Sequence, residues 1–151
     1  MADVPGAVAM TLQALIDRAA IQDVLLRYAR GVDRRDVALV ASCFTPDAGY
    51  DGALGRGPIG DVLTRLGERM ARYTSTLHFL GNQTIELAGD AARSATYALA
   101  HHVLPDGRHR VVAVRYCDDL VRAGGTWHIC RRMVHREWER TDASAPPSSS
   151  P

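Results

Sequence analysis

The chain contains no lysine, and all 18 of its strongly basic residues are arginine. This absence excludes a Schiff-base lysine and the lysine of a phosphate-binding loop. The net charge is only +1, so no strong electrostatic field favours nucleic acid or an acidic membrane surface as a partner. No apolar run approaches the roughly 18 residues of a membrane helix, and the first residues lack the basic segment of a secretory signal. We therefore expect a cytoplasmic protein.

Cysteine is also scarce, and the motifs of several common enzyme classes are missing. Cys43, Cys117 and Cys130 are odd in number and lack zinc-ligand spacing, which indicates free thiols rather than a metal site or a disulfide framework. The patterns G-x-S-x-G and H-E-x-x-H do not occur, nor does a glycine-rich phosphate loop. We therefore expect no metal and look for chemistry among the histidines, arginines and carboxylates.

The order of patterns along the 151 residues predicts one domain. A helix capped by Thr11 should run to about Gly31, a short helix should cover residues 35–44, and a third should start at Pro58 and reach Met70. A turn at 45–49 and at most one short strand near Tyr50 are expected between the last two helices. The folded domain should span residues 11–140, between a flexible arm at 1–10 and a disordered Pro/Ser-rich tail at 141–151.

After Tyr73 the spacing of apolar residues changes to that of strands. Four long runs, within residues 74–89, 94–104, 109–122 and 126–140, are joined by short Gly/Asp turns, which predicts an antiparallel meander. Helices followed by hairpins indicate an α+β fold. We expect three helices packed inside a curved, mainly antiparallel sheet, as a cone-shaped α+β barrel with a pocket between the layers.

Asp33 stands out at the end of the first predicted helix. It lies at the edge of the apolar face that carries Val24, Leu25 and Tyr28, where a carboxylate is costly unless it is paired. Helix capping explains it poorly, because an acid at a helix C-terminus opposes the dipole. Pairing with the neighbouring arginines 34 and 35 is the structural explanation, and a working group in a pocket is the functional one.

Histidines on the predicted strands are the natural partners of this carboxylate. His78 in "TLHFLGN" shares a strand face with Thr76 and Leu80, and a buried Asp33 would fix its tautomer to make a general base. Taken alone, the pattern around His78 favours a satisfied core or edge residue, and the functional interpretation needs such a partner. Of the adjacent pair His101 and His102, only one can face a pocket.

The last predicted strand leaves its inner face undecided. One face carries His128, Cys130, Arg132, Val134, Arg136 and Trp138, and the other carries Trp127, Ile129, Arg131, Met133 and His135. Both faces mix charge with bulk, and a bulge would change the parity. An inward arginine would bind an anionic or oxyanion-like group.

Three stretches, "RAAIQDVLLRYARGVDRRD", "LHFLGNQTIEL" and "GTWHICRRMVHREW", resemble the SnoaL-like group of the nuclear-transport-factor-2 superfold. Within it, the chain is similar to the branch of scytalone dehydratase, bile-acid dehydratase and hexachlorocyclohexane dehydrochlorinase, over residues 12–140. The resemblance implies a catalytic dyad of Asp33 and His78, with Tyr28 as a further catalytic residue. It places active-site arginines at Arg132 or Arg136, a second histidine near His102, and the inner face of the last strand on the side of His128 and Cys130.

The implied activity is a cofactor-free, dehydratase-type elimination on a small, hydrophobic, cyclic or polyketide-like substrate. Halide elimination is less favoured, because the basic residue expected before the aspartate has no clear match. The residues expected to line an apolar pocket are Leu25, Leu63, Met70 and Leu80.

Other functions remain open at this point. A cyclase or isomerase of natural-product biosynthesis would use the same dyad without expelling water. A non-catalytic binding or interaction domain would leave Asp33 and His78 apart or the pocket filled. An epoxide hydrolase would need a second carboxylate, which only Asp118 or Asp119 offers. A homodimer or higher homo-oligomer is expected if Trp127, Ile129 and Met133 form an outer apolar face.

Overall fold

The computed structural model describes residues 11–143, which form three helices and six strands. The elements are α1 (Leu12–Asp33), α2 (Val37–Ala41), β1 (Phe44–Gly52), β2 (Gly55–Pro58), α3 (Ile59–Met70), β3 (Ser75–Ala88), β4 (Ala91–Val103), β5 (His109–Ala123) and β6 (Thr126–Asp142). The predicted arm and residues 144–151 of the predicted tail lie outside the described residues. Within residues 11–143, no helix is long and apolar enough to cross a membrane.

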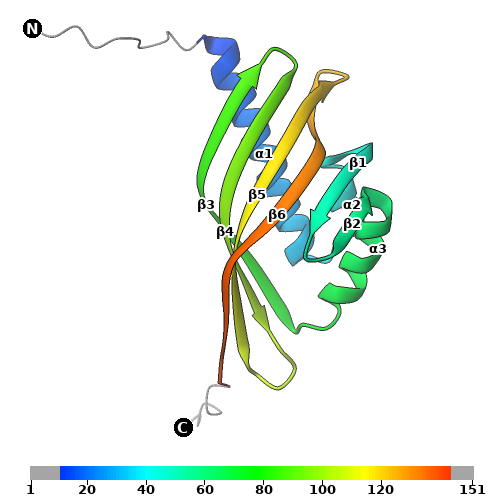
Figure 1. The fold of residues 1–151 in the computed structure, drawn as a ribbon, viewed down its shortest axis with the longest axis vertical. Helices are drawn as coiled ribbons and strands as arrows, with labels where there is room; N and C mark the ends of the chain where they lie inside the picture. The colour runs from blue at the N-terminus through cyan, green and yellow to red at the C-terminus, as the bar shows by residue number, and fades with distance from the viewer. Residues whose placement is uncertain (1–10, 144–151) are drawn as a thin grey trace, which may run out of the picture.

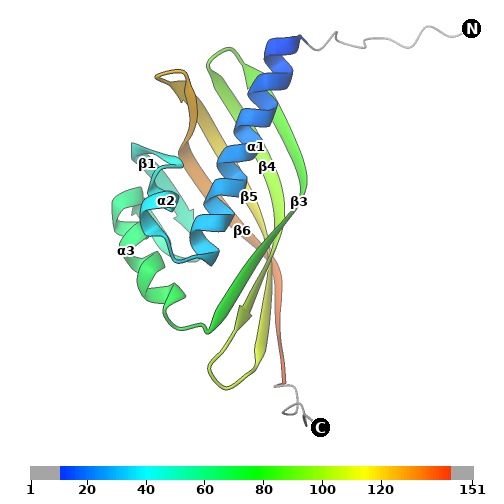
Figure 2. The same cartoon turned by 180° about the vertical axis from the view of Figure 1, so that it is seen from behind.

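The six strands form one twisted sheet in the order β2-β1-β6-β5-β4-β3. The four long strands make the expected antiparallel meander, and β1 joins β6 in parallel. Helix α1 crosses one face of the long strands, with α2 and α3 beside it (Figures 1 and 2). This arrangement confirms the predicted cone-like α+β fold.

Helix α1 follows the predicted pattern but extends past the glycine expected to end it. The Thr11 hydroxyl accepts a hydrogen bond from the amide of Ala14 at 3.1 Å, which caps the N-terminus. Gly31 lies inside the helix, where a Cβ atom would be only 2.8 Å from Cγ2 of Val40. The glycine therefore permits close packing of α1 on α2, and the helix continues to Asp33.

The glycine-rich segment differs most from the prediction. Residues 45–49, expected as a turn, belong to β1, and β2 pairs with β1 as an antiparallel hairpin. The side chains of Phe44, Ala48 and Tyr50 are buried. A shift in the pairing of β1 with β6 between Phe44 and Gly49 interrupts the alternation. That irregularity, together with proline and glycine, hides the strand in the sequence.

A bulge in β6 decides which residues of the last strand face inward. Ile129 pairs with Leu120, whereas Arg131 pairs with Asp119, so Cys130 is the extra residue. Trp127 and Ile129 are therefore buried before the bulge, and Arg132 is buried after it. The prediction that His128 and Cys130 share the inner face with Arg132 is wrong, because the bulge reverses the parity.

The same bulge changes the expected outer face. Trp127 and Ile129 belong to the core and cannot form an exposed apolar surface. The large apolar side chains exposed on the strands are instead Leu77, Phe79, Tyr97, Leu99 and Trp138. Phe79 and Leu99 are register partners on β3 and β4. We call these five residues the outer patch.

An ion pair lies at the centre of the core. Arg132 of β6 donates from Nε and Nη2 to the two carboxylate oxygens of Asp118 on β5, each at 2.7 Å, and both side chains are completely buried. The guanidinium carbon lies 4.0 Å from the ring centroid of Tyr28 and 4.4 Å from that of Tyr116. Bidentate geometry and the aromatic rings offset the cost of burying the two charges.

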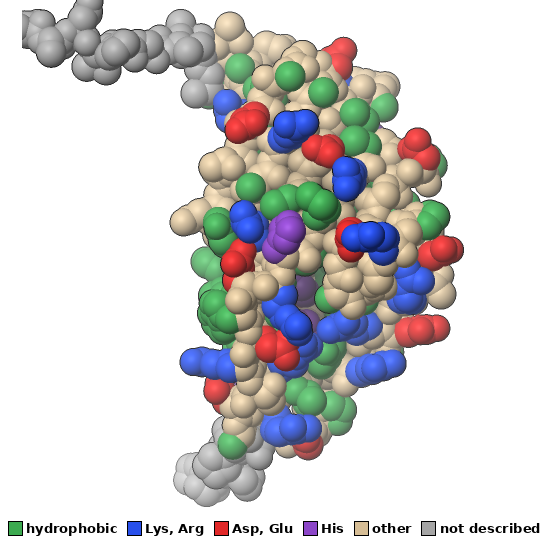
Figure 3. Space-filling view, viewed as in Figure 1, with side chains coloured by type: hydrophobic (Ala, Val, Ile, Leu, Met, Phe, Trp, Pro, Cys, Tyr) green, Lys and Arg blue, Asp and Glu red, His purple; other side chains and the backbone are tan. Residues whose placement is uncertain are grey.

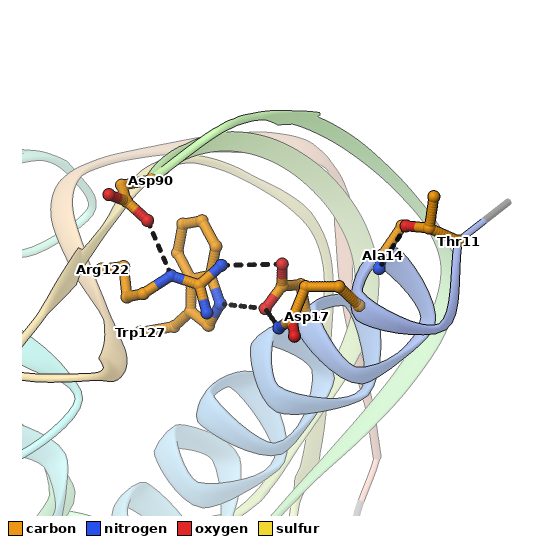
Figure 4. Close-up of polar contacts among 7 residues, drawn as sticks. Thr11, Ala14, Asp17, Asp90, Arg122 and Trp127 are labelled. Carbon is orange, nitrogen blue, oxygen red and sulfur yellow. Dashed lines mark hydrogen bonds and ion pairs between the residues drawn. The ribbon is translucent and has the colours of Figure 1, made fainter.

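A second polar cluster ties the start of α1 to the sheet (Figure 4). The Asp17 carboxylate accepts hydrogen bonds from Arg122 at 2.7 Å and from the indole of Trp127 at 3.3 Å. Arg122 also donates to Asp90 at 2.9 Å, and its guanidinium lies over the Trp127 ring. The cluster therefore holds α1 against the β3–β4 and β5–β6 turns.

Removing the Asp118 carboxylate should destabilise the fold strongly. We expect Asp118→Asn to lower the free energy of unfolding by about 3–5 kcal/mol, because it leaves the Arg132 charge buried without its anion. Urea denaturation followed by circular dichroism measures the change. Asp119→Asn is the matched control, because Asp119 is half-exposed in its ion pair with Arg93, and should cost about 1 kcal/mol or less. Equal losses in the two variants would contradict this role.

The Asp17 cluster should make stability depend on acid pH. The hydrogen bond from Arg122 holds the pKa of Asp17 below its ordinary value, despite burial, which raises it. A depressed pKa stabilises the fold above the ordinary carboxyl range, and this stabilisation is lost as pH falls through the folded-state pKa. We expect the melting temperature of Asp17→Asn to be lower than that of wild type at neutral pH. The difference in melting temperature should shrink as the pH is lowered. Asp23→Asn, on the exposed face of α1, should show no such difference.

Candidate active site

A cavity of about 440 Å³ lies between the helices and the concave side of the sheet. That volume suits a compact small molecule. Its wall comes from α1, α3, the β1–β2 hairpin and strands β3 to β6, and comprises Tyr28, Val32, Tyr50, Ala53, Leu54, Leu66, Arg69, Met70, His78, Ala100, His102, Arg110, Val112, Val114, Tyr116, Val134 and Arg136.

Asp33 and His78 are in direct contact at one side of this cavity. The Asp33 carboxylate lies 2.7 Å from Nδ1 of His78 and also accepts from the His78 backbone amide at 2.8 Å and from the Thr76 hydroxyl at 3.1 Å. Within residues 11–143, the Asp33 carboxylate pairs with the ring of His78 and forms an ion pair with neither of the neighbouring arginines. The carboxylate at the helix end is therefore paired across to the sheet.

These contacts determine the charge and orientation of the pair. Burial raises the pKa of Asp33, but the hydrogen bonds from the ring and backbone of His78 outweigh it, so the pKa is lowered overall. The carboxylate therefore stays ionised at neutral pH. Because Asp33 engages Nδ1, the ring nitrogen left for the cavity is Nε2.

Tyr28 lies in the cavity wall and is almost completely buried. Its ring packs edge-to-face on Phe44 and Tyr116, with centroids 6.0 and 5.7 Å away. Burial raises the pKa of its phenol, against the lowering effect of Arg132. The hydroxyl therefore remains protonated and can donate a hydrogen bond.

His102 also lines the cavity, on the same face of β4 as Ala100. Its ring centroid lies 5.9 Å from that of His78 and 4.5 Å from that of Tyr73. Burial lowers the pKa of His102 to about 4, reinforced by His78, Arg110 and Arg69. A neutral imidazole is therefore present beside the dyad.

Of the two arginines predicted for the site, only Arg136 lines the cavity. It donates to Glu139 at 2.7 Å, and its side chain is well exposed. Arg132 is not part of the lining, because it is completely buried behind the tyrosines and neutralised by Asp118. The prediction that Arg132 meets substrate is therefore corrected to a structural position under Tyr28.

The apolar lining also differs in part from the prediction. Met70 lines the cavity, whereas Leu25, Leu63 and Leu80 do not. Leu25 is fully buried in the core, and Leu63 and Leu80 pack against it from its edge. The cavity takes its apolar surface instead from Val32, Leu66, Ala100, Val112, Val114 and Val134.

Several lining groups are not evident from the sequence. Tyr50 is missed because its strand is interrupted, and Arg69 because it lies at the edge of the apolar stripe of α3. Tyr116 offered a signal: it alternates with the buried Val114 and Asp118 along β5. Arg110 is the second residue of β5. An arginine at the end of a strand would be predicted from sequence to be exposed.

The arrangement supplies a proton acceptor, hydrogen-bond donors and cations around an apolar space. Within the described part of the chain, no group of three or more His, Cys, Asp or Glu side chains is placed to hold a metal ion. The dyad can remove a proton, the Tyr28 phenol can donate a hydrogen bond, and the arginines can stabilise negative charge.

The chain is similar in sequence to a mycobacterial protein and in fold to several proteins of known structure. It is 30% identical over 131 residues to an uncharacterized protein of Mycobacterium tuberculosis, with 82% of this chain and 88% of the relative covered. A crystal structure of a hexachlorocyclohexane dehydrochlorinase of type 2 superposes with a TM-score of 0.79 at 25% identity, covering 91% of this chain and 98% of that one. A protein of Novosphingobium aromaticivorans assigned as an aromatic ring hydroxylase gives a TM-score of 0.78 at 27% identity, covering 85% and 94%.

The family profile of the SnoaL-like domain matches residues 13–133, from the first turn of α1 to the middle of β6. The match includes α1, the cavity wall formed by β3 to β5, and both members of the Asp33–His78 pair. The chain therefore belongs to the family of SnoaL-like domains.

Proposed function

We propose that the protein is a lyase that eliminates water from a small hydrophobic substrate without a cofactor, with His78 and Asp33 as the general-base dyad. The observation that carries the proposal is the 2.7 Å contact between Asp33 and Nδ1 of His78 at the wall of an apolar cavity. This contact orients an imidazole whose other nitrogen is left for substrate. General bases of this kind act when the ring reaches the proton directly or through one water.

The proposed reaction removes a proton and a hydroxyl from neighbouring carbons. Nε2 of His78 takes the proton next to a carbonyl group, and Asp33 stabilises the imidazolium that forms. The electron pair of the C–H bond forms the new double bond as the C–O bond breaks. The imidazolium returns its proton to the leaving hydroxyl, so water departs and the enzyme is regenerated. The Tyr28 hydroxyl would donate a hydrogen bond to the carbonyl oxygen, which gains negative charge during the step.

The comparisons support an elimination in general terms. The dehydrochlorinase, by its name, eliminates hydrogen chloride, and it shares this fold. The phenol of Tyr28 stands one and a half turns before Asp33 on α1 and suits a carbonyl or hydroxyl partner better than a halide. We therefore favour water as the leaving group.

Two alternatives use the same site differently. A cyclase or isomerase would move the proton with the same dyad and release a product of unchanged mass. A non-catalytic binding domain would be favoured by a separated dyad or a filled pocket, and both the 2.7 Å contact and the 440 Å³ cavity weigh against it.

A test of the dyad can use bicyclic β-hydroxy ketones, of which 3-hydroxy-1-tetralone is a simple member. Loss of water converts it to 1-naphthol, which is measured by fluorescence and mass. We expect wild type to accelerate turnover, and Asp33→Asn and His78→Gln each to reduce kcat by about 100- to 10,000-fold. A product of unchanged mass would favour the isomerase or cyclase instead.

Matched controls separate loss of the dyad from loss of the fold. Asp23→Asn removes an exposed carboxylate from the same helix, and His101→Gln changes a histidine outside the cavity lining. Both should retain wild-type kcat. Full turnover in Asp33→Asn or His78→Gln, for any ketone that the wild type converts, would dismiss the proposed mechanism.

We also propose that the outer patch mediates self-association. Its five apolar side chains are 36–64% exposed, and a cluster of this kind is typical of an interface. We expect Phe79→Glu to reduce the mass of the protein in solution to that of a monomer, as measured by light scattering. Leu26→Glu, which changes an exposed leucine of α1, should leave the mass unchanged. A wild-type protein that is already monomeric would contradict the assembly.

A further inference from the structure

The charged groups that line the cavity are all of one sign. Arg69, Arg110 and Arg136 contribute to the wall, and no aspartate or glutamate does among the described residues. Asp33 stands behind His78 rather than in the lining. The charge of three guanidinium groups beside an apolar wall must be balanced by water, by protein or by a ligand.

Arg69 is the least balanced of the three. It extends from the last turn of α3 and donates from Nη1 to the carbonyl oxygen of Ala53 at 3.0 Å. Within residues 11–143 it forms no ion pair with a carboxylate, and it is half-buried. One hydrogen bond to a neutral carbonyl leaves most of its five donor positions and its full charge available.

Arg110 and Arg136 share a single carboxylate. Glu139 accepts from Nη2 of Arg110 at 2.9 Å and from Nη1 of Arg136 at 2.7 Å. Arg110 also donates from Nη1 to the Tyr73 hydroxyl at 3.0 Å, which fixes the plane of its guanidinium. Two cations against one anion leave one positive charge here, in addition to that of Arg69.

Arg69 and Arg110 lie at the mouth of the cavity. Both also line an adjoining surface hollow, which contains Arg65 and Arg72 with Glu68 as its one acidic residue, and Ala53 and Leu54 are likewise common to the two spaces. Basic side chains gather around a hollow in this half of the molecule (Figure 3). A ligand seated in the cavity would therefore point one end between Arg69 and Arg110.

We propose that the substrate carries an anionic group, a carboxylate or a phosphate, which binds between Arg69 and Arg110 at the mouth while its apolar body extends toward His78. The inference rests on the proposed function for its identification of the cavity occupant as substrate. Arginine recognises both anions by paired, charge-assisted hydrogen bonds. Anchoring the charged end would leave the reacting carbons at the dyad.

The field of these arginines reaches the cavity interior. Burial is the largest cause of the lowered pKa of His102, and the charges of both Arg110 and Arg69 add to it. The charge of Arg69 also lowers the pKa of the Tyr50 phenol, against the larger raising effect of burial. An anion bound at the mouth would offset the positive charge of these arginines.

Binding of paired aromatic probes tests the inference without needing turnover. The probes are benzoate, 2-naphthoate and 3-phenylpropionate, each compared with its neutral amide by isothermal titration calorimetry, and 2-naphthyl phosphate. We expect the best carboxylate to bind about ten-fold or more tightly than its amide, in line with one charge-assisted contact. A preference for the naphthyl phosphate over naphthoate would identify phosphate as the anion, and the reverse would identify carboxylate.

Arginine variants locate the anion. Arg69→Gln and Arg110→Gln should each remove most of the anion preference, while affinity for the amide changes less than two-fold. Arg72→Gln, which removes a charge only from the adjoining hollow, should keep the preference, and melting curves should show that all three variants fold. Carboxylates that bind no better than amides, or equal losses in Arg72→Gln, would overturn the inference.

The outcome is independent of the dyad. His78→Gln should retain the preference for anions because it does not alter the mouth. Loss of turnover in His78→Gln with no anion preference in wild type would reject the anion site alone. Anion preference together with unchanged turnover in His78→Gln would reject the proposed elimination alone.

Discussion

The buried ion pair between Arg132 and Asp118 is the constraint on which the cavity depends. Two charges are removed from water at the centre of the sheet, and this is tolerable only with bidentate geometry and aromatic rings against the guanidinium. Tyr28 packs on one side and Tyr116 on another, so α1 and β5 are held at fixed positions relative to β6. The two tyrosines thereby separate the Arg132–Asp118 pair on one side from the cavity on the other.

Helix α1 carries this constraint to the dyad. Tyr28 and Asp33 belong to one continuous helix, so fixing the Tyr28 ring limits where the Asp33 carboxylate can lie. Gly31 allows the last turn to approach α2 closely, and Asp33 then meets both the ring and the backbone amide of His78. The Asp17 cluster holds the other end of the helix. The helix is thus attached to the sheet at its start, middle and end.

The periodic elements and the position of Asp33 could be predicted from sequence because each has a local signal, whereas the pairing of Asp33 with His78, 45 residues away, was expected from the family resemblance. The meander follows from alternation, and Asp33 from a carboxylate at an apolar helix edge. The inner face of β6 could not be predicted, because the extra residue Cys130 reverses parity and only pairing with β5 reveals it. Strand β1 depends on parallel pairing with a segment about 80 residues away, a non-local interaction that has no local pattern. The role of Arg132 could not be predicted for the same reason, because its partner Asp118 is brought to it only by the pairing of β5 with β6.

The contrast between two arginines links the architecture to ligand choice. Arg132 is completely enclosed, so the fold itself must supply its counter-charge, and Asp118 does so. Arg69 borders the cavity and remains partly exposed, so water can solvate it while the site is empty and the fold need not supply an anion. A ligand that displaces this water must replace it with hydrogen-bond acceptors, and an anion does so most favourably. The positions where the protein leaves its own cations unpaired are therefore those where it can discriminate by charge. Under the proposed function, the apolar wall would select the shape of the substrate and the Asp33–His78 pair its reactivity.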